Sequence, residues 1–123
     1  MIEVSIVEDD PDIRESLALL INGTPGFKCI SSFGSCEKAI KGIPKDIPDV
    51  VLMDIGLPGL SGIEGIKALK EKLPELDIMV LTIQSDDKVV FEALCAGACG
   101  YMIKDTPPAQ LLEAIQETLN GGA

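Results

Sequence analysis

Five short apolar runs alternate with five longer stretches whose apolar residues recur at helical spacing, and no other feature constrains the fold as much. The first, third and fourth runs are almost continuously apolar and rich in β-branched residues, which is typical of strands covered by helices on both faces. The predicted strands are residues 3–7, 27–33, 49–54, 78–82 and 100–104. Strict alternation of strand and helix predicts parallel strands with right-handed crossovers, in a doubly wound α/β sandwich.

Turn and capping residues mark the ends of the five predicted helices. Pro11 begins the first helix, with Asp10 and Asp12 as its expected capping residues, and Ser61 is a suitable N-cap for the third. The predicted helices are residues 11–22, 35–43, 61–73, 85–97 and 107–119. No repeat, low-complexity tract or internal linker interrupts this pattern, so we expect the 123 residues to form one domain.

The charge and the residue types exclude several classes of protein. Twenty acidic residues against ten basic ones leave a formal charge of -10, which disfavours direct binding of nucleic acid and favours cations or basic partners. The chain has no histidine, which excludes histidine-dependent catalytic triads and histidine-ligated zinc. Because it has no basic, cleavable leader and no apolar run of membrane-spanning length, we expect a soluble, cytoplasmic protein.

The four cysteines contain no Cys-X-X-Cys pair and stand in apolar surroundings. They are Cys29, Cys36, Cys95 and Cys99. We therefore expect small buried hydrophobic residues in a reducing compartment rather than disulfides or zinc ligands.

Polar side chains stand where four of the predicted strands end. Glu8 and Asp9 follow the first strand, Asp54 ends the third, Thr82 ends the fourth and Lys104 ends the fifth. Because ligands of such sheets bind at the carboxyl ends of parallel strands, we expect these groups to share one site. Clustered carboxylates without sulfur or nitrogen ligands suit a hard divalent ion, and Mg²⁺ is the natural choice in a cell.

The hydroxyl and the ammonium group extend this hypothesis to phosphoryl chemistry. Thr82 and Lys104 suit the oxygens of a phosphoryl group on Asp54, with a metal ion on its other side. A carboxylate that attacks phosphorus becomes an aspartyl phosphate, so Asp54 is predicted to be a nucleophile while Glu8 and Asp9 hold Mg²⁺. Each residue alone also fits an ordinary role as surface charge or strand end, and only the combination supports the hypothesis.

Four segments resemble the signatures of one known family. They are "IVEDDPDIR" (6–14), "DVVLMDIGLPGLSGIE" (49–64), "IMVLT" (78–82) and "AGACGYMIKD" (96–105). In order and spacing they resemble the receiver domain of bacterial response regulators, over essentially the whole chain. The resemblance implies a flavodoxin-like three-layer sandwich, with a five-stranded parallel sheet in the order 2-1-3-4-5 and five helices. It also implies that a sensor histidine kinase, or a small acyl phosphate, donates a phosphoryl group to the domain.

The resemblance implies a role for each matching residue. The phosphoacceptor is Asp54, and the metal site consists of Glu8, Asp9, Asp54 and the backbone carbonyl of Gly56. The phosphoryl-binding and switch residues are Thr82 and Lys104, and the switch aromatic is Tyr101. The residues that modulate access or phosphoryl lifetime are Gly56, Ile83 and Gln84. Ile83 stands where many receivers have a small residue, so we expect slow reaction with small donors. Asp105 replaces a frequent cis-proline, which leaves the shape of that loop open. Tyr101 also fits a half-buried residue at the sheet edge.

The segment "AGACGYMIKDTPPAQLLEAI" (96–115) most resembles the LuxR-like transcription factors, whose receivers continue into a helix-turn-helix domain. The resemblance implies that residues 1–123 are one receiver excised from a longer regulator, which reaches DNA only through that absent domain. Phosphorylation would shift a population between two states and change the surface of the fourth helix, last strand and last helix, to control transcription. A phosphorylation-dependent homodimer is a further hypothesis, and no membrane partner is expected. Such a receiver catalyses its own phosphotransfer and dephosphorylation but is not a turnover enzyme.

Three alternatives compete with this interpretation. A phosphohydrolase of the haloacid dehalogenase type usually has a second aspartate two residues after the nucleophile, where Gly56 stands. A nucleotide or flavin module needs glycines after the first strand, where the chain has "EDDPD". A phosphorylation-independent, receiver-like interaction module stays open, although its usual mark is loss of the metal acids, of Asp54 or of Lys104, and all are present.

Overall fold

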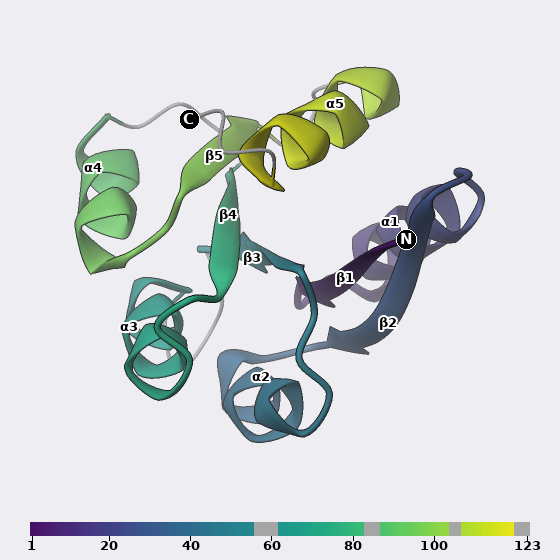
Figure 1. The fold of residues 1–123 in the computed structure, drawn as a ribbon. Helices are drawn as coiled ribbons and strands as arrows, with labels where there is room; N and C mark the ends of the chain where they lie inside the picture. Colours follow the sequence, from purple (N-terminus) through teal and green to yellow (C-terminus); the bar gives the residue numbers. More distant parts are fainter. Residues whose placement is uncertain (56–61, 83–86, 104–106, 120–123) are drawn as a thin grey trace.

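The computed structural model describes residues 1–55, 62–82, 87–103 and 107–119, in which helices cover both faces of one parallel sheet (Figure 1). The strands are β1 (Ile2–Val7), β2 (Phe27–Phe33), β3 (Val50–Asp54), β4 (Asp77–Thr82) and β5 (Gly100–Ile103). The helices are α1 (Pro11–Asn22), α2 (Cys36–Gly42), α3 (Gly62–Lys72), α4 (Asp87–Ala96) and α5 (Pro108–Leu119), with a 3₁₀ turn η1 at Ile43–Lys45. None of the helices in these ranges has the length and apolar content needed to cross a membrane.

The sheet has the order β2-β1-β3-β4-β5 with every pair of neighbours parallel, which confirms the predicted fold class. The middle strand, β3, consists of five buried residues, because α-helices cover it on both sides. Its alternate residues face opposite layers of the sandwich. Val51 and Met53 join the core under α2, α3 and α4, whereas Val50 and Leu52 join the core under α1 and α5.

The observed ends of the elements differ from the predicted ones by a residue or two. The second helix was predicted over 35–43, but Ser35 is its N-cap and the α-helix ends at Gly42. Pro44 explains the early end, because it has no N–H to continue the helix, and Ile43 begins a 3₁₀ turn instead. The predicted starts of the third and fourth helices, at residues 61 and 85–86, lie outside the described residues.

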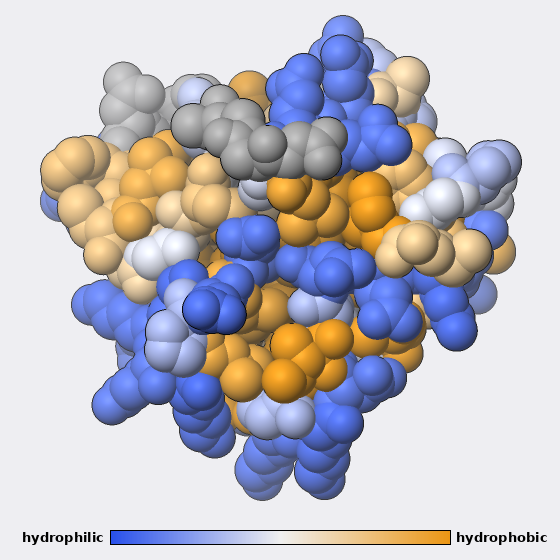
Figure 2. Space-filling view, in the orientation of Figure 1, coloured by the Kyte–Doolittle hydropathy of each residue, from blue (hydrophilic) through white to orange (hydrophobic). Residues whose placement is uncertain are grey.

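The cysteines differ in exposure more than their sequence surroundings suggest. Cys36 is buried and Cys29 and Cys99 are half-buried, but Cys95 is exposed on α4. The prediction of a buried residue is therefore confirmed for Cys36 and wrong for Cys95. Helix α4 carries apolar residues on its solvent side as well, because Phe91 is 66% exposed, and hydrophobic colour gathers over this helix at the left of Figure 2.

Candidate functional site

The pairing of β1 with β3 brings the candidate acids together. In this register Val7 lies opposite Met53, so the next residues along the two strands are Glu8 and Asp54. From here β1 leads into α1 on one face of the sheet and β3 leads to α3 on the other. Such a switch point leaves an opening at the carboxyl edge of a parallel sheet, and ligands of this fold class bind there.

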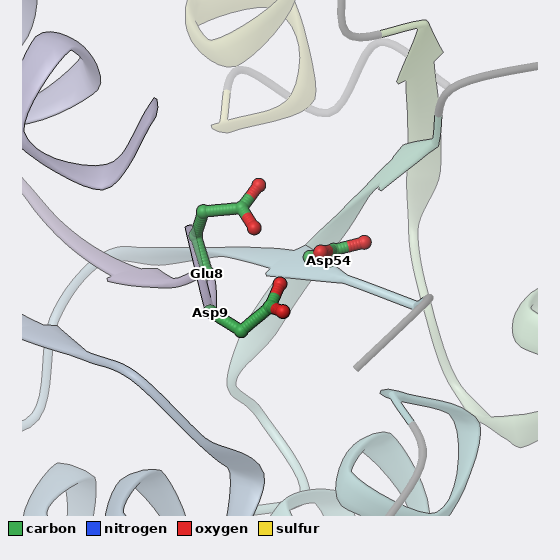
Figure 3. Close-up of side chains that lie close together, drawn as sticks. All are labelled: Glu8, Asp9 and Asp54. Carbon is green, nitrogen blue, oxygen red and sulfur yellow. The ribbon is translucent and has the colours of Figure 1, made fainter. Parts of the chain in front are cut away.

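Three carboxylates meet at this edge (Figure 3). Glu8 is fully buried, Asp54 is 4% exposed and Asp9 is exposed, and one oxygen from each lies within 4.8 Å of the others. Oxygens bound to one Mg²⁺ ion lie about 3 Å apart when adjacent and about 4 Å apart when opposite, so the three carboxylates would have to move closer together to share an ion. An all-carboxylate set also has the chemistry that hard divalent cations prefer. The residues present therefore fit a metal ion of this kind.

The main chain of Glu8 is held from several directions. Its N–H donates to the carbonyl of Phe33 at the end of β2 (3.0 Å), and its carbonyl accepts from Nη1 of Arg14 on α1 (2.8 Å). Its carboxylate oxygen Oε2 accepts from the N–H of Asp10 (3.2 Å). These bonds fix Glu8 at the end of β1.

The neighbouring acids of "EDDPD" (8–12) have different roles in the structure. The Asp10 carboxylate caps α1 by accepting from the N–H groups of Asp12 (2.9 Å) and Ile13 (3.4 Å), as predicted. The capping role predicted for Asp12 is wrong, because this residue lies inside the first turn and is itself capped. Its negative charge instead interacts favourably with the positive N-terminal end of the helix dipole.

Asp54 ends β3 between two paired strands, opposite Leu81 of β4 in the register. Thr82, the next residue of β4, is 9% exposed and ends its strand at the same edge. The first residue of α3, Gly62, approaches this strand end very closely. A Cβ on Gly62 would lie 2.4 Å from Cα of Ile55 and 2.6 Å from the carbonyl oxygen of Asp54, so only glycine fits here.

The other predicted site residues are placed less completely. Tyr101 lies on the edge strand β5, opposite Val80, and is exposed (43%), more than the half-buried position that the sequence suggested. Its role as a switch stays a prediction. The residues Gly56, Ile83, Gln84 and Lys104 lie outside the described residues.

A buried thiol lies behind the acidic cluster. Cys36 donates from Sγ to Sδ of Met53 (3.7 Å), next to Asp54 in β3. Burial, together with the smaller effect of the charges of Glu37, Asp54 and Glu64, raises the pKa of the Cys36 thiol from 9.0 to about 11. The thiol is therefore protonated near neutral pH and packs as a small apolar group.

Residues 4–116 match the family described as the response regulator receiver domain. The chain belongs to this family. It is 36% identical over 124 residues to the transcriptional activator protein ExaE of Pseudomonas putida and 34% identical over 119 residues to the nitrate/nitrite response regulator protein NarP of Escherichia coli. These matches cover 98% and 97% of this chain but 56% and 55% of the relatives, so the chain spans about half their length.

The solved structures agree with this assignment. A two-component response regulator of the LuxR family from Aurantimonas sp. SI85-9A1 has a TM-score of 0.93 at 30% identity, over 98% of this chain and 86% of that one. The response regulator domain of CheB from Thermotoga maritima has a TM-score of 0.89 at 26% identity, over 98% and 97%. The predicted likeness to receivers of LuxR- and NarL-type regulators is confirmed.

Two features of the site were missed by the sequence reasoning. The first is Arg14, a single basic residue after a run of acids, whose bond to Glu8 depends on a side-chain conformation. The second is Gly62, whose closeness to Ile55 depends on how α3 packs. Two signals in the sequence could have pointed to these residues. For Arg14 the signal is a basic residue that follows an acidic segment, and for Gly62 it is a glycine at the start of a predicted helix.

Proposed function

We propose that this receiver domain is a phosphorylation-dependent switch whose phosphoacceptor is Asp54. The observation that supports this best is the group of Glu8, Asp9 and Asp54 at the carboxyl edge of the sheet, with oxygens within 4.8 Å of one another. Bound Mg²⁺ would neutralise the charge that these carboxylates and a phosphoryl donor bring together. Glu8 and Asp9 would bind it from β1, with Asp54 and the carbonyl of Gly56 on the β3 side.

In the proposed reaction, a carboxylate oxygen of Asp54 attacks the phosphorus of a phosphohistidine on a sensor kinase, or of a small acyl phosphate. The new O–P bond forms while the bond to the donor's nitrogen or acyl oxygen breaks, and the leaving group keeps that electron pair. The hydroxyl of Thr82 and the ammonium of Lys104 bind the phosphoryl oxygens. Water later hydrolyses the aspartyl phosphate, which releases inorganic phosphate and restores the Asp54 carboxylate. Because the phosphoryl group is accepted by the domain itself, the domain acts as a switch and not as a turnover enzyme.

The output of the switch is a change of surface. Phosphorylation shifts the population toward a state in which Thr82 contacts the phosphoryl group and Tyr101 turns inward. The face formed by α4, β5 and α5 then controls a partner, which in the full-length protein is a DNA-binding domain that regulates transcription. This proposal rests on the transcriptional regulators among the relatives. The same proposal includes a sensor histidine kinase in the cytoplasm as the phosphoryl donor. It also includes a homodimer of the domain that forms on phosphorylation.

Intact mass spectrometry after incubation with acetyl phosphate tests the central step. We expect the addition of one phosphoryl group that requires Mg²⁺ and is lost in Asp54→Asn. Slow addition would be explained by the bulk of Ile83, and Ile83→Ala should then accelerate it. If the wild type gains no mass and beryllofluoride with Mg²⁺ leaves its NMR spectrum unchanged, the domain is a phosphorylation-independent interaction module instead.

A further inference from the structure

A positive charge lies directly beside the acidic cluster, although a cation there opposes the binding of another cation. Arg14 stands in the second turn of α1, and its Nη1 donates to the carbonyl of Glu8 at 2.8 Å. The guanidinium thus bonds to the main chain of a candidate metal-binding residue. The main-chain bond, rather than the charge, indicates what this side chain does for the site.

The bond from Arg14 controls more than one atom. The carbonyl of Glu8 and the N–H of Asp9 belong to one planar peptide unit, so holding the oxygen fixes the orientation of the whole unit. The N–H of Glu8 is held separately by the carbonyl of Phe33, at 3.0 Å. Together these bonds tie the end of β1 to both β2 and α1. The backbone that carries both carboxylates, of Glu8 and of Asp9, is therefore fixed before any metal ion arrives.

The loop after β2 leaves space for the guanidinium. A Cβ on Gly34 would lie 3.1 Å from Nη1 of Arg14 and 3.8 Å from its Cζ. The guanidinium therefore packs against Gly34, where a lone Cβ would make it shift by a few tenths of an ångström and a branched side chain would displace it further. The position of the guanidinium is therefore defined by three segments, which are the end of β1, helix α1 and the β2–α2 loop.

We propose that Arg14 is a positioning residue of the metal site, which holds the Glu8–Asp9 peptide so that both carboxylates point at the ion. The inference rests on the proposed function, because it assumes that these acids bind a divalent cation. Residues that orient metal ligands commonly contribute a factor of about 10 to 100 to metal affinity. For Arg14, which acts through the backbone, we expect about tenfold.

The sign of the effect separates this role from two simpler ones. If Arg14 acted only through its charge, Arg14→Met would remove a repulsive cation and the site would bind metal more tightly. If Arg14 only stabilised the fold, the variant would unfold more easily but bind metal with unchanged affinity. Positioning predicts weaker binding in spite of the more favourable charge.

The experiment is a titration with Mn²⁺, a hard ion that suits the same oxygen ligands, in which electron paramagnetic resonance measures the free ion. We expect Arg14→Met to raise the dissociation constant about tenfold. Arg14→Lys, which keeps one donor and the charge, should restore part of the affinity. Lys38→Met is the matched control, because it removes one exposed positive charge from α2 and should leave the affinity unchanged or slightly higher.

The metal-free protein supplies a second measurement. The N–H of Asp10 donates to Oε2 of Glu8, so its hydrogen exchange, followed by NMR, reports how well the Glu8 carboxylate is placed. We expect faster exchange at Asp10 in Arg14→Met and unchanged exchange in Lys38→Met. Unchanged exchange in both variants would contradict the positioning role.

Other outcomes are equally decisive. Equal or tighter Mn²⁺ binding by Arg14→Met overturns the inference while leaving the proposed function intact. Failure of the wild type to bind Mn²⁺ overturns the metal site itself, and both proposals with it. If Arg14→Met does not fold, Gly34→Val replaces it, because a branched side chain here displaces the guanidinium further than the few tenths of an ångström that a lone Cβ requires, keeps the charge, and should also weaken binding. Unchanged binding by a folded Gly34→Val then counts against the inference.

Discussion

The close packing of α3 on the strand end that carries Asp54 makes Gly62→Ala the most informative substitution. The added Cβ would lie 2.4 Å from Cα of Ile55 and 2.6 Å from the carbonyl oxygen of Asp54. Non-bonded carbon atoms prefer about 3.5–4.0 Å, so the helix start and the strand end would have to separate by about 1 Å. Both contacts are with backbone atoms, and no change of side-chain rotamer can relieve them.

Two opposing terms set the cost of this substitution. Overpacking of this kind lowers the free energy of unfolding by about 1–3 kcal/mol. Alanine is favoured over glycine by at most about 1 kcal/mol inside a helix, and Gly62 is only the first helical residue. We therefore expect a net loss of about 1–2 kcal/mol. A displacement of about 1 Å at Asp54, the proposed nucleophile, should also slow phosphorylation, by up to about 100-fold.

Gly65→Ala is the matched control in the same helix. Its Cβ would lie 2.6 Å from Sγ of Cys36, a side-chain atom on α2, so it should destabilise the fold without displacing Asp54. Urea denaturation followed by circular dichroism measures stability, and intact mass during incubation with acetyl phosphate measures the rate. A wild-type rate in Gly62→Ala, or equal slowing in both variants, would refute the argument.

Three further predictions concern stability and use the same denaturation measurement. Asp10→Ala removes the N-cap of α1 and should lower the free energy of unfolding by about 1 kcal/mol. Asp12→Ala removes only a charge in the first turn and should lower the free energy of unfolding by about 0.5 kcal/mol. Equal losses in the two variants would contradict the capping role of Asp10. Leu69→Ala empties a fully buried position and should cost about 2–5 kcal/mol, whereas Leu19→Ala, at a side chain that is 70% exposed, should stay within about 0.5 kcal/mol. Burial raises the pKa of Cys36 from 9.0 to about 11, so the unfolded state binds fewer protons than the folded state between these values. Stability should therefore fall as the pH rises from 9 to 11, and a pH series should show a shallower fall in Cys36→Ala.

The sheet and its acidic edge could be predicted because both follow from short-range patterns. A continuous apolar run such as β3 must be buried on both faces, and alternating strands and helices leave few allowed topologies. Once β1 and β3 are neighbours, residues that follow them must meet at one edge. Glu8 and Asp54 could therefore be paired without any knowledge of side-chain positions.

Apolar periodicity could not predict which side of α4 faces the solvent. This helix is apolar on most of its surface, so the pattern does not distinguish buried Ala93 from exposed Cys95 and Leu94. The contacts of Arg14 and Gly62 were also beyond prediction, because they depend on one rotamer and on the exact approach of one helix. How far a side chain reaches and how closely a helix packs depend on the assembled layers of the fold, and not on the residues that are adjacent in the sequence.

The pairing of β1 with β3 also bears on quality control in the cell. These strands are neighbours in the sheet although α1, β2, α2 and η1 lie between them in the chain. Such distant pairing is entropically costly and forms only with the surrounding core. A chain that is still being synthesised, or that has misfolded in its central strands, has its three carboxylates apart from one another. Under the proposed function, only an assembled molecule would present them together to a phosphoryl donor, so faulty copies would not be phosphorylated.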